Sequence, residues 1–331
     1  MNAVTMEWES RLGRRMRVRD LYILSVVVKS GSMAKAARQL AMTQPAVSEA
    51  IANLEQILRV RLLDRSPRGV EPTIYGDAVL KRSTTVFDEL KQSVRDVESL
   101  ADPTKGEVRI GCTETIAATF LPQTIERFSM KYPKAVVHVD NVPTYRQALA
   151  ILATRQYDLV LARLFTPVEA DVGDLNAECL FNDPLVVAAG AHNPLARRRK
   201  IDLAELVDEP WIMQAPHTWN HMRMAEAFRA RGLTVPKATL VTLSWPLIAY
   251  FVSSGAFITS YPTSVARHHS LKVLPVNLPV RPWPVTILTL KNRTLSPAVE
   301  RFIECARAAA KTLASGRQQV RAKQLLTKAM A

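Results

Sequence analysis

Apolar positions recur with a helical period in three short segments near the N-terminus. Residues 20–29 (DLYILSVVVK) predict an apolar helix that ends at Gly31, and Ser32 is placed to cap a second helix over residues 32–40. Thr43 is placed to cap a third helix, along which apolar residues recur every three or four positions: Val47, Ile51, Leu54 and Leu58. Two short helices, a brief turn and a third helix with a polar N-terminal face predict a helix-turn-helix.

A short hairpin is predicted directly after these helices. Residues 61–65 and 70–73 are the two strands, with a Ser-Pro-Arg-Gly turn between them. Pro72 cannot donate a ladder hydrogen bond, so its strand is expected at an edge. Arg65 and Arg68 would then be exposed and able to reach phosphates or a narrow minor groove. This part of the chain therefore predicts a winged helix.

A narrow apolar seam follows between residues 76 and 101. Its positions step alternately by four and three: Gly76, Leu80, Ser83, Phe87, Leu90, Val94, Val97 and Ala101. Such a seam is typical of a helix that pairs with the same helix of a second chain, whereas a core helix usually has a wider apolar stripe. We therefore expect a dimerisation helix over 76–101, ended by Asp102-Pro103-Thr104.

Beyond residue 105 the pattern changes to alternating strands and helices. The expected strands are 107–112, 135–140 and 158–163, with helices 118–131 and 144–154 between them. This βαβαβ order demands a parallel sheet covered by helices, which makes this half an α/β fold. A second unit is expected with strands near 183–189, 210–214 and 256–260 and helices near 219–231 and 246–253.

The composition excludes several classes of protein. With 331 residues, 48% of them apolar and 22% charged, the chain has material for about two or three domains and is neither disordered nor collagen-like. Its three scattered cysteines form no CxxC pair, so neither a disulfide framework nor a zinc site is expected. We find no signal peptide and interpret the most apolar stretch, 240–261, as buried core with loops, although its length leaves a membrane-embedded alternative open. We expect a soluble cytoplasmic protein.

The net charge of +14 indicates a polyanionic partner such as nucleic acid. Residues 14–82 carry 13 Lys and Arg against 6 Asp and Glu, whereas residues 210–331 carry 16 against 3. Charge alone therefore does not identify the winged helix as the nucleic-acid-binding part. The run Arg197-Arg198-Arg199-Lys200 is typical of a solvated basic turn, and the basic segment 317–331 indicates no specific role.

The N-terminal segment resembles the DNA-binding domain of the LysR-type transcriptional regulators. The resemblance runs without a gap and rests on Gly31-Ser32, Ala36-Ala37-x-x-Leu40, residues 44–48 (QPAVS), Ile51-x-x-Leu54-Glu55, Arg61-Leu62-Leu63-x-Arg65 and Thr73-x-x-Gly76. It implies that the start of the recognition helix contacts DNA, and that Arg65 and its neighbours contact DNA from the wing. The expected DNA-contacting residues are Ser32, Lys35, Thr43, Gln44, Pro45, Ser48, Glu49, Arg65, Ser66 and Arg68. Without the wing, a Gln-Pro-Ala after a threonine would indicate no more than a capped helix.

Three positions depart from the pattern of that family. Glu49 stands where the family often has arginine, and an acid there can accept from a cytosine amino group instead. Arg59 replaces the glycine that usually ends the recognition helix, and Pro72 replaces a leucine. Family members usually begin near Met16, so residues 1–15 are an extension or follow from a misplaced start.

Residues 106–310 resemble the effector domain of the same family, a two-lobed fold similar to periplasmic solute-binding proteins. The matching features are Gly111, Leu121-Pro122, Tyr157-Asp158-Leu159, the turn at 192–195 and the segment 255–262. The resemblance implies effector contacts from loops, at Thr113, Thr115, Thr144, Arg163, His217, Thr218, Trp219, Thr242 and Ser244. Hydroxyls and N–H groups at helix starts suit an anion and Arg163 would reinforce this, whereas Glu114 would oppose it. The threonines are equally well interpreted as simple helix caps.

The resemblance implies a division of the chain into six segments. These are an N-terminal extension at 1–16, a winged helix-turn-helix at 17–73, a linker and dimerisation helix at 74–102, effector lobe I at 103–167 and 267–314, lobe II at 168–266, and a basic tail at 315–331. His217 and His221 are four residues apart but have no third ligand nearby, so we expect no metal and no cofactor.

We expect a sequence-specific regulator that binds promoter DNA as a homo-oligomer and responds to a small molecule, with an anion as one candidate. Its expected partners are double-stranded DNA, the effector and a second copy through 76–101, with a tetramer implied by the resemblance, RNA polymerase a further candidate and no membrane. An enzyme is not expected, because the α/β half has no GxSxG, GxGxxG, GxxxxGK[ST] or HExxH motif. A secreted transport-type binding protein would need a signal peptide and no wing. A ligand-independent DNA-binding protein of the same fold stays open.

Overall fold

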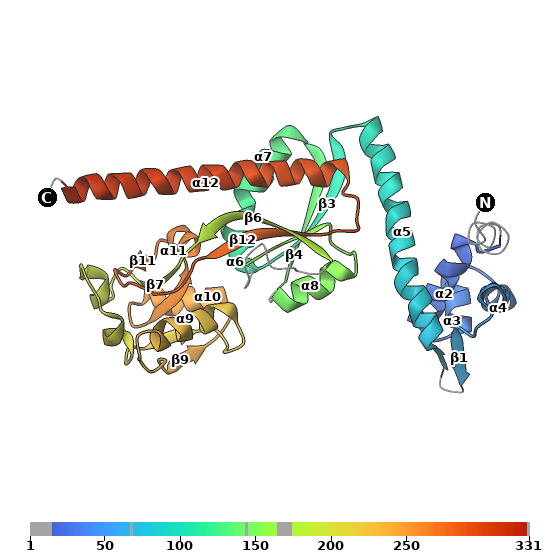
Figure 1. Ribbon diagram of the computed structural model, residues 1–331, viewed down its shortest axis with the longest axis horizontal. Coiled ribbons are helices and arrows are strands. Elements are labelled where there is room, and N and C mark those ends of the chain that lie inside the picture. Colours follow the sequence, from blue (N-terminus) through green and yellow to red (C-terminus); the bar gives the residue numbers. More distant parts are fainter. Residues whose placement is uncertain (1–14, 67–68, 143–144, 164–173, 330–331) are drawn as a thin grey trace, which may run out of the picture. The chain divides into compact units, whose positions relative to one another are not determined.

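The computed structural model describes residues 15–66, 69–142, 145–163 and 174–329 (Figure 1). The chain divides into two compact units, Met1–Ser93 and Val94–Ala331. The first unit is built from helices and one hairpin, and the second contains two five-stranded sheets. This is the expected order of a winged helix followed by an α/β domain.

The first unit begins with three helices that share one core. They are α2 (Val18–Ser30), α3 (Met33–Gln39) and α4 (Gln44–Leu58). Gly31 ends α2 in the left-handed conformation at φ 64°, where glycine avoids the steric cost of a side chain. The hydroxyls of Ser32 and Thr43 accept from the backbone N–H groups of Lys35 and Ala46, each at 3.4 Å. The predicted helix-turn-helix and both of its caps are confirmed.

The apolar stripe of α4 forms the centre of this core. Val47, Ile51 and Leu54 are fully buried, as their spacing predicts. Leu58, which the spacing places in the same stripe, is only partly buried because the helix ends there. The helix ends at Arg59, whose φ of 57° is a left-handed conformation that costs a residue with a side chain roughly 1 kcal/mol.

The wing is the antiparallel hairpin of β1 (Leu63–Ser66) and β2 (Gly69–Pro72). Two sets of hydrogen bonds from backbone N–H groups of the hairpin fix it to the helices, one to a side-chain carboxylate and one to a backbone carbonyl. Glu55 of α4 accepts from two N–H groups at the start of the hairpin, and the N–H of Val70 donates to the carbonyl of Gly31 at 3.0 Å. The predicted wing is confirmed, and its two-stranded sheet leaves Pro72 at an edge as expected.

The long helix α5 (Ile74–Ala101) has two differently packed halves. In its first half, apolar side chains that include Leu80 and Phe87 pack against the winged-helix core. In its second half, Leu90, Val94, Val97 and Leu100 are exposed by 48%, 59%, 67% and 80%. Of these four, Leu90, Val94 and Val97 are positions of the predicted seam, which therefore serves the core of the first unit over one half of the helix and forms an apolar surface strip over the other.

The first sheet of the second unit has the strand order β4-β3-β5-β12-β6, and we call this part lobe I. Its strands are β3 (Lys105–Cys112), β4 (Lys134–Asn141), β5 (Leu159–Arg163), β6 (Leu175–Asp183) and β12 (Trp283–Leu290). β3, β4 and β5 are parallel, as the βαβαβ pattern predicts, whereas β12 is antiparallel to both β5 and β6. Helices α7 (Leu121–Lys131) and α12 (Pro297–Ala329) cover one face, and α8 (Tyr145–Ala153) covers the other (Figure 1).

The second sheet has the strand order β11-β7-β10-β8-β9, and we call this part lobe II. Its strands are β7 (Leu185–Ala189), β8 (Trp211–Met213), β9 (Ala238–Val241), β10 (Ile258–Pro262) and β11 (Lys272–Val273). Its helices are α9 (Trp219–Arg229), α10 (Trp245–Ser253), α11 (Thr263–His268) and two short 3-10 helices, η2 (Pro194–Arg197) and η3 (Leu203–Leu206). Trp211 and Phe228 are fully buried and pack edge to face in its core.

The boundaries of the lobes differ from the expected ones. We expected lobe II to span 168–266, but β6 is an edge strand of the lobe I sheet and β11 pairs within the sheet of lobe II. The expected helix 118–131 is divided into α6 (Glu114–Thr119) and α7, because the chain bends at Phe120 and Pro122 lies in the first turn of α7. Most of the segment 315–331, expected as a tail, continues α12 as far as Ala329.

Among the described helices, none is long and apolar enough to cross a membrane. The apolar stretch 240–261 is divided among β9, α10 and β10. Cys112 and Cys305 are buried, Cys179 is exposed, and all three are free thiols. In the part of the chain that the structure describes, no three His, Cys, Asp or Glu side chains lie close enough together to hold a metal ion.

Candidate functional site

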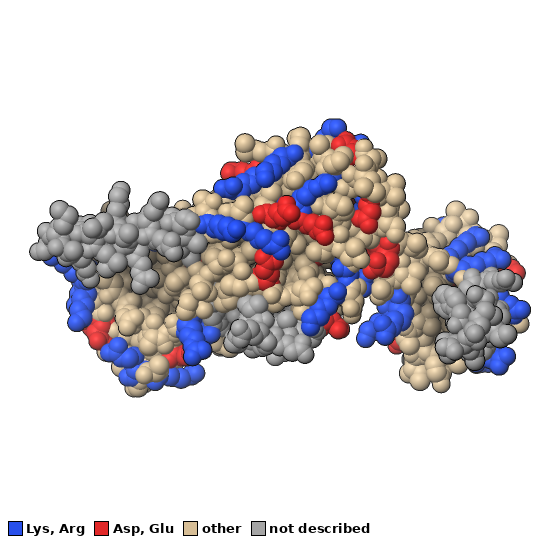
Figure 2. Space-filling view, turned by 45° about the horizontal axis from the view of Figure 1, so that its top comes forward, with Lys and Arg blue, Asp and Glu red and all other residues tan. Residues whose placement is uncertain are grey.

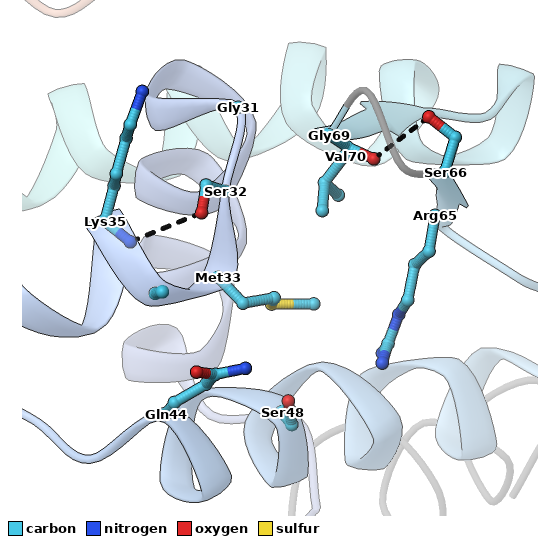
Figure 3. Close-up of a pocket in the computed structure, with 11 residues that line it drawn as sticks. Gly31, Ser32, Met33, Lys35, Gln44, Ser48, Arg65, Ser66, Gly69 and Val70 are labelled. Carbon is cyan, nitrogen blue, oxygen red and sulfur yellow. Dashed lines mark hydrogen bonds between the residues drawn. The ribbon is translucent and has the colours of Figure 1, made fainter.

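A groove of about 490 Å³ in the first unit is lined by three elements (Figure 3). They are the start of α3, the first two turns of α4 and the β1–β2 hairpin. The lining residues are Gly31, Ser32, Met33, Ala34, Lys35, Gln44, Ser48, Arg65, Ser66, Gly69 and Val70. The groove therefore lies where α4 and the wing face one another.

The start of α4 supplies an amide and a hydroxyl to this groove. Gln44 and Ser48 are one helical turn apart, so they point to the same side of α4 (Figure 3). Thr43 caps the helix and Pro45 occupies its first turn, where no N–H is required. Gln44 is exposed and Ser48 half-buried. Amide and hydroxyl groups at an exposed helix start are able to hydrogen-bond base edges in a major groove.

Two exposed cations lie at opposite ends of the groove. Lys35 extends from α3, and Arg65 extends from β1 towards α4 (Figure 3). Among the described residues, no carboxylate lies within ion-pair distance of either side chain. Both charges are therefore available to anionic groups such as phosphates on either side of Gln44 and Ser48.

Backbone contact fixes the distance between the wing and α3. Gly69 has a φ of 137°, and a Cβ at this position would lie 2.7 Å from the carbonyl oxygen of Gly31. Only glycine permits this approach, which lets the neighbouring N–H of Val70 bond to the same carbonyl. The hydroxyl of Ser66 donates to the carbonyl of Gly69 at 3.4 Å. Arg65 thus projects from a strand whose position is set by the turn between α2 and α3.

Six of the ten residues predicted to contact DNA line this groove: Ser32, Lys35, Gln44, Ser48, Arg65 and Ser66. Thr43 and Pro45 shape the start of α4, Glu49 is exposed, and none of these three lines the groove. Arg68 lies outside the described residues. Gly69 is not among the predicted residues, although its place at the hairpin turn is a signal for close backbone approach.

Two family models match the chain. Residues 18–77 match the model described as "Bacterial regulatory helix-turn-helix protein, lysR family", and residues 101–311 match the model described as "LysR substrate binding domain". The chain belongs to the LysR family of transcriptional regulators. It is therefore a DNA-binding regulator with an effector-binding domain, and its domains are those of regulators rather than enzymes.

Relatives in this family are similar over most of their length. YdcI, an uncharacterized HTH-type transcriptional regulator of Escherichia coli K12, is 26% identical over 306 residues, which cover 91% of this chain and 98% of YdcI. CmpR, an HTH-type transcriptional activator of Synechocystis, is 31% identical over 214 residues, which cover 64% of this chain and 67% of CmpR.

Solved structures of LysR-family regulators share the fold. A full-length OxyR variant from Pseudomonas aeruginosa has a TM-score of 0.62 at 20% identity and covers 89% of this chain and 95% of its own. CbnR in complex with its target DNA has a TM-score of 0.52 at 22% identity and covers 89% of this chain and 100% of its own.

In the effector-binding domain of this LysR-family regulator, four of the predicted effector residues lie together. The hydroxyl oxygens of Thr113 and Thr115 are 3.2 Å apart, and Nη1 of Arg163 donates to Oγ1 of Thr115 at 2.9 Å. The guanidinium of Arg163 also lies 5.3 Å from the centre of the Trp219 ring, a cation–π distance. The start of α6, the end of β5 and the start of α9 therefore meet where lobe I faces lobe II.

Asp183 is not among the predicted residues, yet it determines the charge of this region. Its Oδ2 lies 3.0 Å from Nη2 of Arg163, and the Asp183 and Arg163 side chains are 0% and 2% exposed. Asp183 also accepts from the N–H of Ser264 at 3.1 Å and from the Ser264 hydroxyl, which joins the end of β6 to the start of α11. Asp183 therefore balances the positive charge of Arg163, which was expected to reinforce the binding of an anion here.

The other predicted effector residues are separate from this cluster or serve local structure. The hydroxyl of Thr218 accepts from a backbone N–H in the first turn of α9, as a simple helix cap does. His217 and Ser244 are exposed, and the Thr242 hydroxyl accepts from the N–H of Ser244 at 3.0 Å. Thr144 lies outside the described residues. The interpretation of these threonines as caps therefore holds for Thr218.

A second buried carboxylate joins the end of α5 to lobe I. Asp158, at the start of β5, is 3% exposed, and its Oδ1 lies 3.3 Å from Nη1 of Arg95 and 3.0 Å from Nη2 of Arg293. Its Oδ2 accepts from the N–H of Arg109 at 2.8 Å. Arg95 belongs to the last two turns of α5, and Arg293 follows β12. One side chain thus holds three segments that are far apart in the sequence.

Proposed function

We propose that this regulator reads promoter DNA with the groove of its winged helix. The observation that carries the proposal is the arrangement of Gln44 and Ser48 between Lys35 and Arg65 (Figure 3). Amide and hydroxyl groups hydrogen-bond base edges, whereas lysine and arginine hold phosphates. The groove combines a surface that discriminates between sequences with two contacts that position it on any sequence.

The regulator binds this DNA as a homo-oligomer. The apolar strip on the second half of α5, with Val94 and Val97 more than half exposed, supports pairing with the same helix of a second chain. A dimer presents two recognition helices to a site with two-fold symmetry. The resemblance to LysR-type regulators supports association into a tetramer.

A small molecule between the lobes controls the affinity for DNA. The convergence of Thr113, Thr115 and Trp219 supports a ligand with hydrogen-bonding groups and a face that packs on an aromatic ring. The bonds from Asp183 to Ser264 join the two lobes, so a ligand that alters them changes how the lobes pack. A coupling of roughly 1–3 kcal/mol would change DNA affinity about 5–150-fold. DNA as the partner places the regulator in the cytoplasm, where RNA polymerase is a further candidate partner.

The test of DNA reading is a titration of the full-length protein with DNA from upstream of its own gene. Scrambled DNA of equal length and composition is the control, and both are measured at two salt concentrations. We expect a preference on the order of 10³ or more for the upstream fragment. Equal affinity for both fragments would rule out sequence reading, and no binding to either would overturn the proposal.

A ligand-independent DNA-binding protein of the same fold is the second candidate. The buried Arg163–Asp183 pair favours it, because these two charged groups between the lobes already bind each other. The same titration is repeated with small carboxylic acids, amino acids and sugars. A compound that changes affinity at least about 5-fold in the wild type but not in Thr115→Val supports the effector-responsive regulator. A change that persists in Thr115→Val would exclude this site, and no change with any compound favours the second candidate.

A further inference from the structure

Lobe II carries a cluster of exposed cations at one place on its surface. Four follow one another at the end of η2 and two lie at the end of α9: Arg197, Arg198, Arg199, Lys200, Arg229 and Arg231. The two segments are adjacent, because Nη2 of Arg231 lies 3.4 Å from Oδ2 of Asp202, two residues after Lys200. We call these six residues the lobe II basic surface. Figure 2 shows lysine and arginine side chains gathered over lobe II, at the lower left.

The turn that carries this surface is anchored on both sides. Before it, Asn193 is 4% exposed, its Oδ1 accepts from the N–H of Leu195 at 2.9 Å and its Nδ2 donates to the carbonyl of Gly255 at 2.8 Å. After it, Ile201 is 3% exposed and belongs to the core of lobe II. The cations are therefore presented on a defined turn, which lowers the entropy that a partner must overcome to order them.

The acids within this surface are already engaged. Asp202 and Glu205 form the capping box of η3, Glu205 pairs with Arg198, and Asp202 pairs with Arg231. The N–H of Ala204 and the nearby Arg231 lower the pKa of Asp202, and hydrogen bonds from Arg198 and from the N–H of Asp202 lower the pKa of Glu205, so both are charged at neutral pH.

The lobe II basic surface keeps a positive charge after this pairing. Its six cations and these two acids leave a net charge of +4, and residues 185–280 as a whole carry 10 Lys and Arg against 5 Asp and Glu. In the described part of the chain, no carboxylate lies within ion-pair distance of Arg197, Arg199 or Lys200. Three cations of this one turn thus remain available to an external anion.

We propose that the lobe II basic surface binds the phosphate backbone of duplex DNA outside the site that the winged helix reads. Five of its six cations are arginines, whose planar guanidinium groups donate paired hydrogen bonds to phosphate oxygens. Contacts of this kind add affinity that is sensitive to salt and carries no sequence preference. The proposal rests on promoter binding by the winged helix and adds a second contact on another part of the chain.

The test compares two duplexes that contain the same winged-helix site. One is trimmed to the site, and the other extends by about three helical turns on either side. The variant Arg197→Gln/Arg199→Gln/Lys200→Gln, made in the full-length protein, removes the three available cations and leaves both ion pairs of the surface in place. On the long duplex, we expect the slope of log affinity against log salt to become shallower by about 2–3, and the affinity at low salt to fall roughly 10-fold or more. On the trimmed duplex, both quantities should match the wild type.

The matched control removes the same charge from exposed positions outside the surface. Lys131→Gln/Lys272→Gln/Arg281→Gln should leave the affinity for the long duplex within about 2-fold of the wild type. If the control loses as much affinity for the long duplex as the triple variant does, the effect is one of total charge and the proposal is overturned. The same holds if the triple variant loses equal affinity for both duplexes. An unchanged affinity of the triple variant for the long duplex would also overturn it and leave an acidic protein surface as the partner to examine. If the wild type fails to bind the trimmed duplex, promoter reading itself has failed.

Discussion

The groove of the winged helix and the region between the lobes use polar side chains in opposite ways. In the groove, Lys35, Gln44 and Arg65 are exposed, and none of their side chains makes a hydrogen bond or ion pair within the described structure. Between the lobes, Arg163 and Asp183 are almost fully buried and bonded to one another. The first region is ready for a partner, whereas a ligand in the second must compete with bonds that already exist. The two regions should therefore respond differently to mutation.

The largest expected effect is on stability and concerns Asp183. The substitution Asp183→Ala removes the carboxylate that the buried Arg163 guanidinium pairs with, so we expect the free energy of unfolding of the second unit to fall by about 3–5 kcal/mol. Chemical denaturation measures it. Glu178→Ala, which removes an exposed ion pair with Arg307, is the control and should cost much less. Equal losses for the two variants would show that burial does not distinguish these pairs.

Arg65→Ala should leave stability unchanged and weaken binding to every DNA sequence. One phosphate contact is lost, so the slope of log affinity against log salt should become shallower by about 1. Titrations on upstream and scrambled DNA at several salt concentrations measure this, with Lys131→Ala in the second unit as the control. If the salt slope of Arg65→Ala equals that of the wild type, Arg65 makes no phosphate contact and the wing is not part of the DNA-binding surface.

Ser48→Ala should act on discrimination rather than on overall affinity. Loss of one hydrogen bond to a base edge costs about 1 kcal/mol on the correct sequence and nothing on scrambled DNA, so the ratio of the two affinities should fall roughly 5-fold. The salt slope should stay the same. If both affinities fall together, Ser48 contacts the backbone instead of a base.

The smallest expected effect is a gain in stability at the end of α4. Arg59→Gly relieves a left-handed conformation at φ 57°, and we expect the free energy of unfolding of the first unit to rise by up to about 1 kcal/mol. Ser270→Gly, at φ 55° on an exposed position of the second unit, is a matched case with the same expected sign. If Arg59→Gly lowers the free energy of unfolding, the Arg59 side chain stabilises the fold by more than its left-handed backbone conformation destabilises it.

Local patterns in the sequence were sufficient for the winged helix. Ser32 and Thr43 cap their helices by accepting hydrogen bonds from backbone N–H groups three residues further on. The apolar stripe of α4 consists of residues only three or four positions apart. Six of the ten predicted DNA contacts line one groove for the same reason, since each is placed by a helix start or a hairpin. The buried position of Ile57 rather than Leu58 was not predictable, because it depends on where the helix ends.

The region between the lobes depends on partners that are distant in the chain. β12 pairs with residues of β6 at least 100 positions earlier, so this pairing has no local signal, and the lobe boundary was misplaced as a result. Asp183 lies at the end of that missed strand, and its partners Arg163 and Ser264 lie 20 and 81 residues away. The sequence therefore indicated the hydroxyls of this region but not the charge that balances Arg163.

The clamp of Asp158 on Arg95 has a mechanical consequence for α5. Arg95 holds the last two turns of a helix of 28 residues, and at 1.5 Å per residue this helix is a lever about 42 Å long. Asp158 thus ties the last two turns of a long, stiff helix to the start of a buried strand, so that these two segments move together.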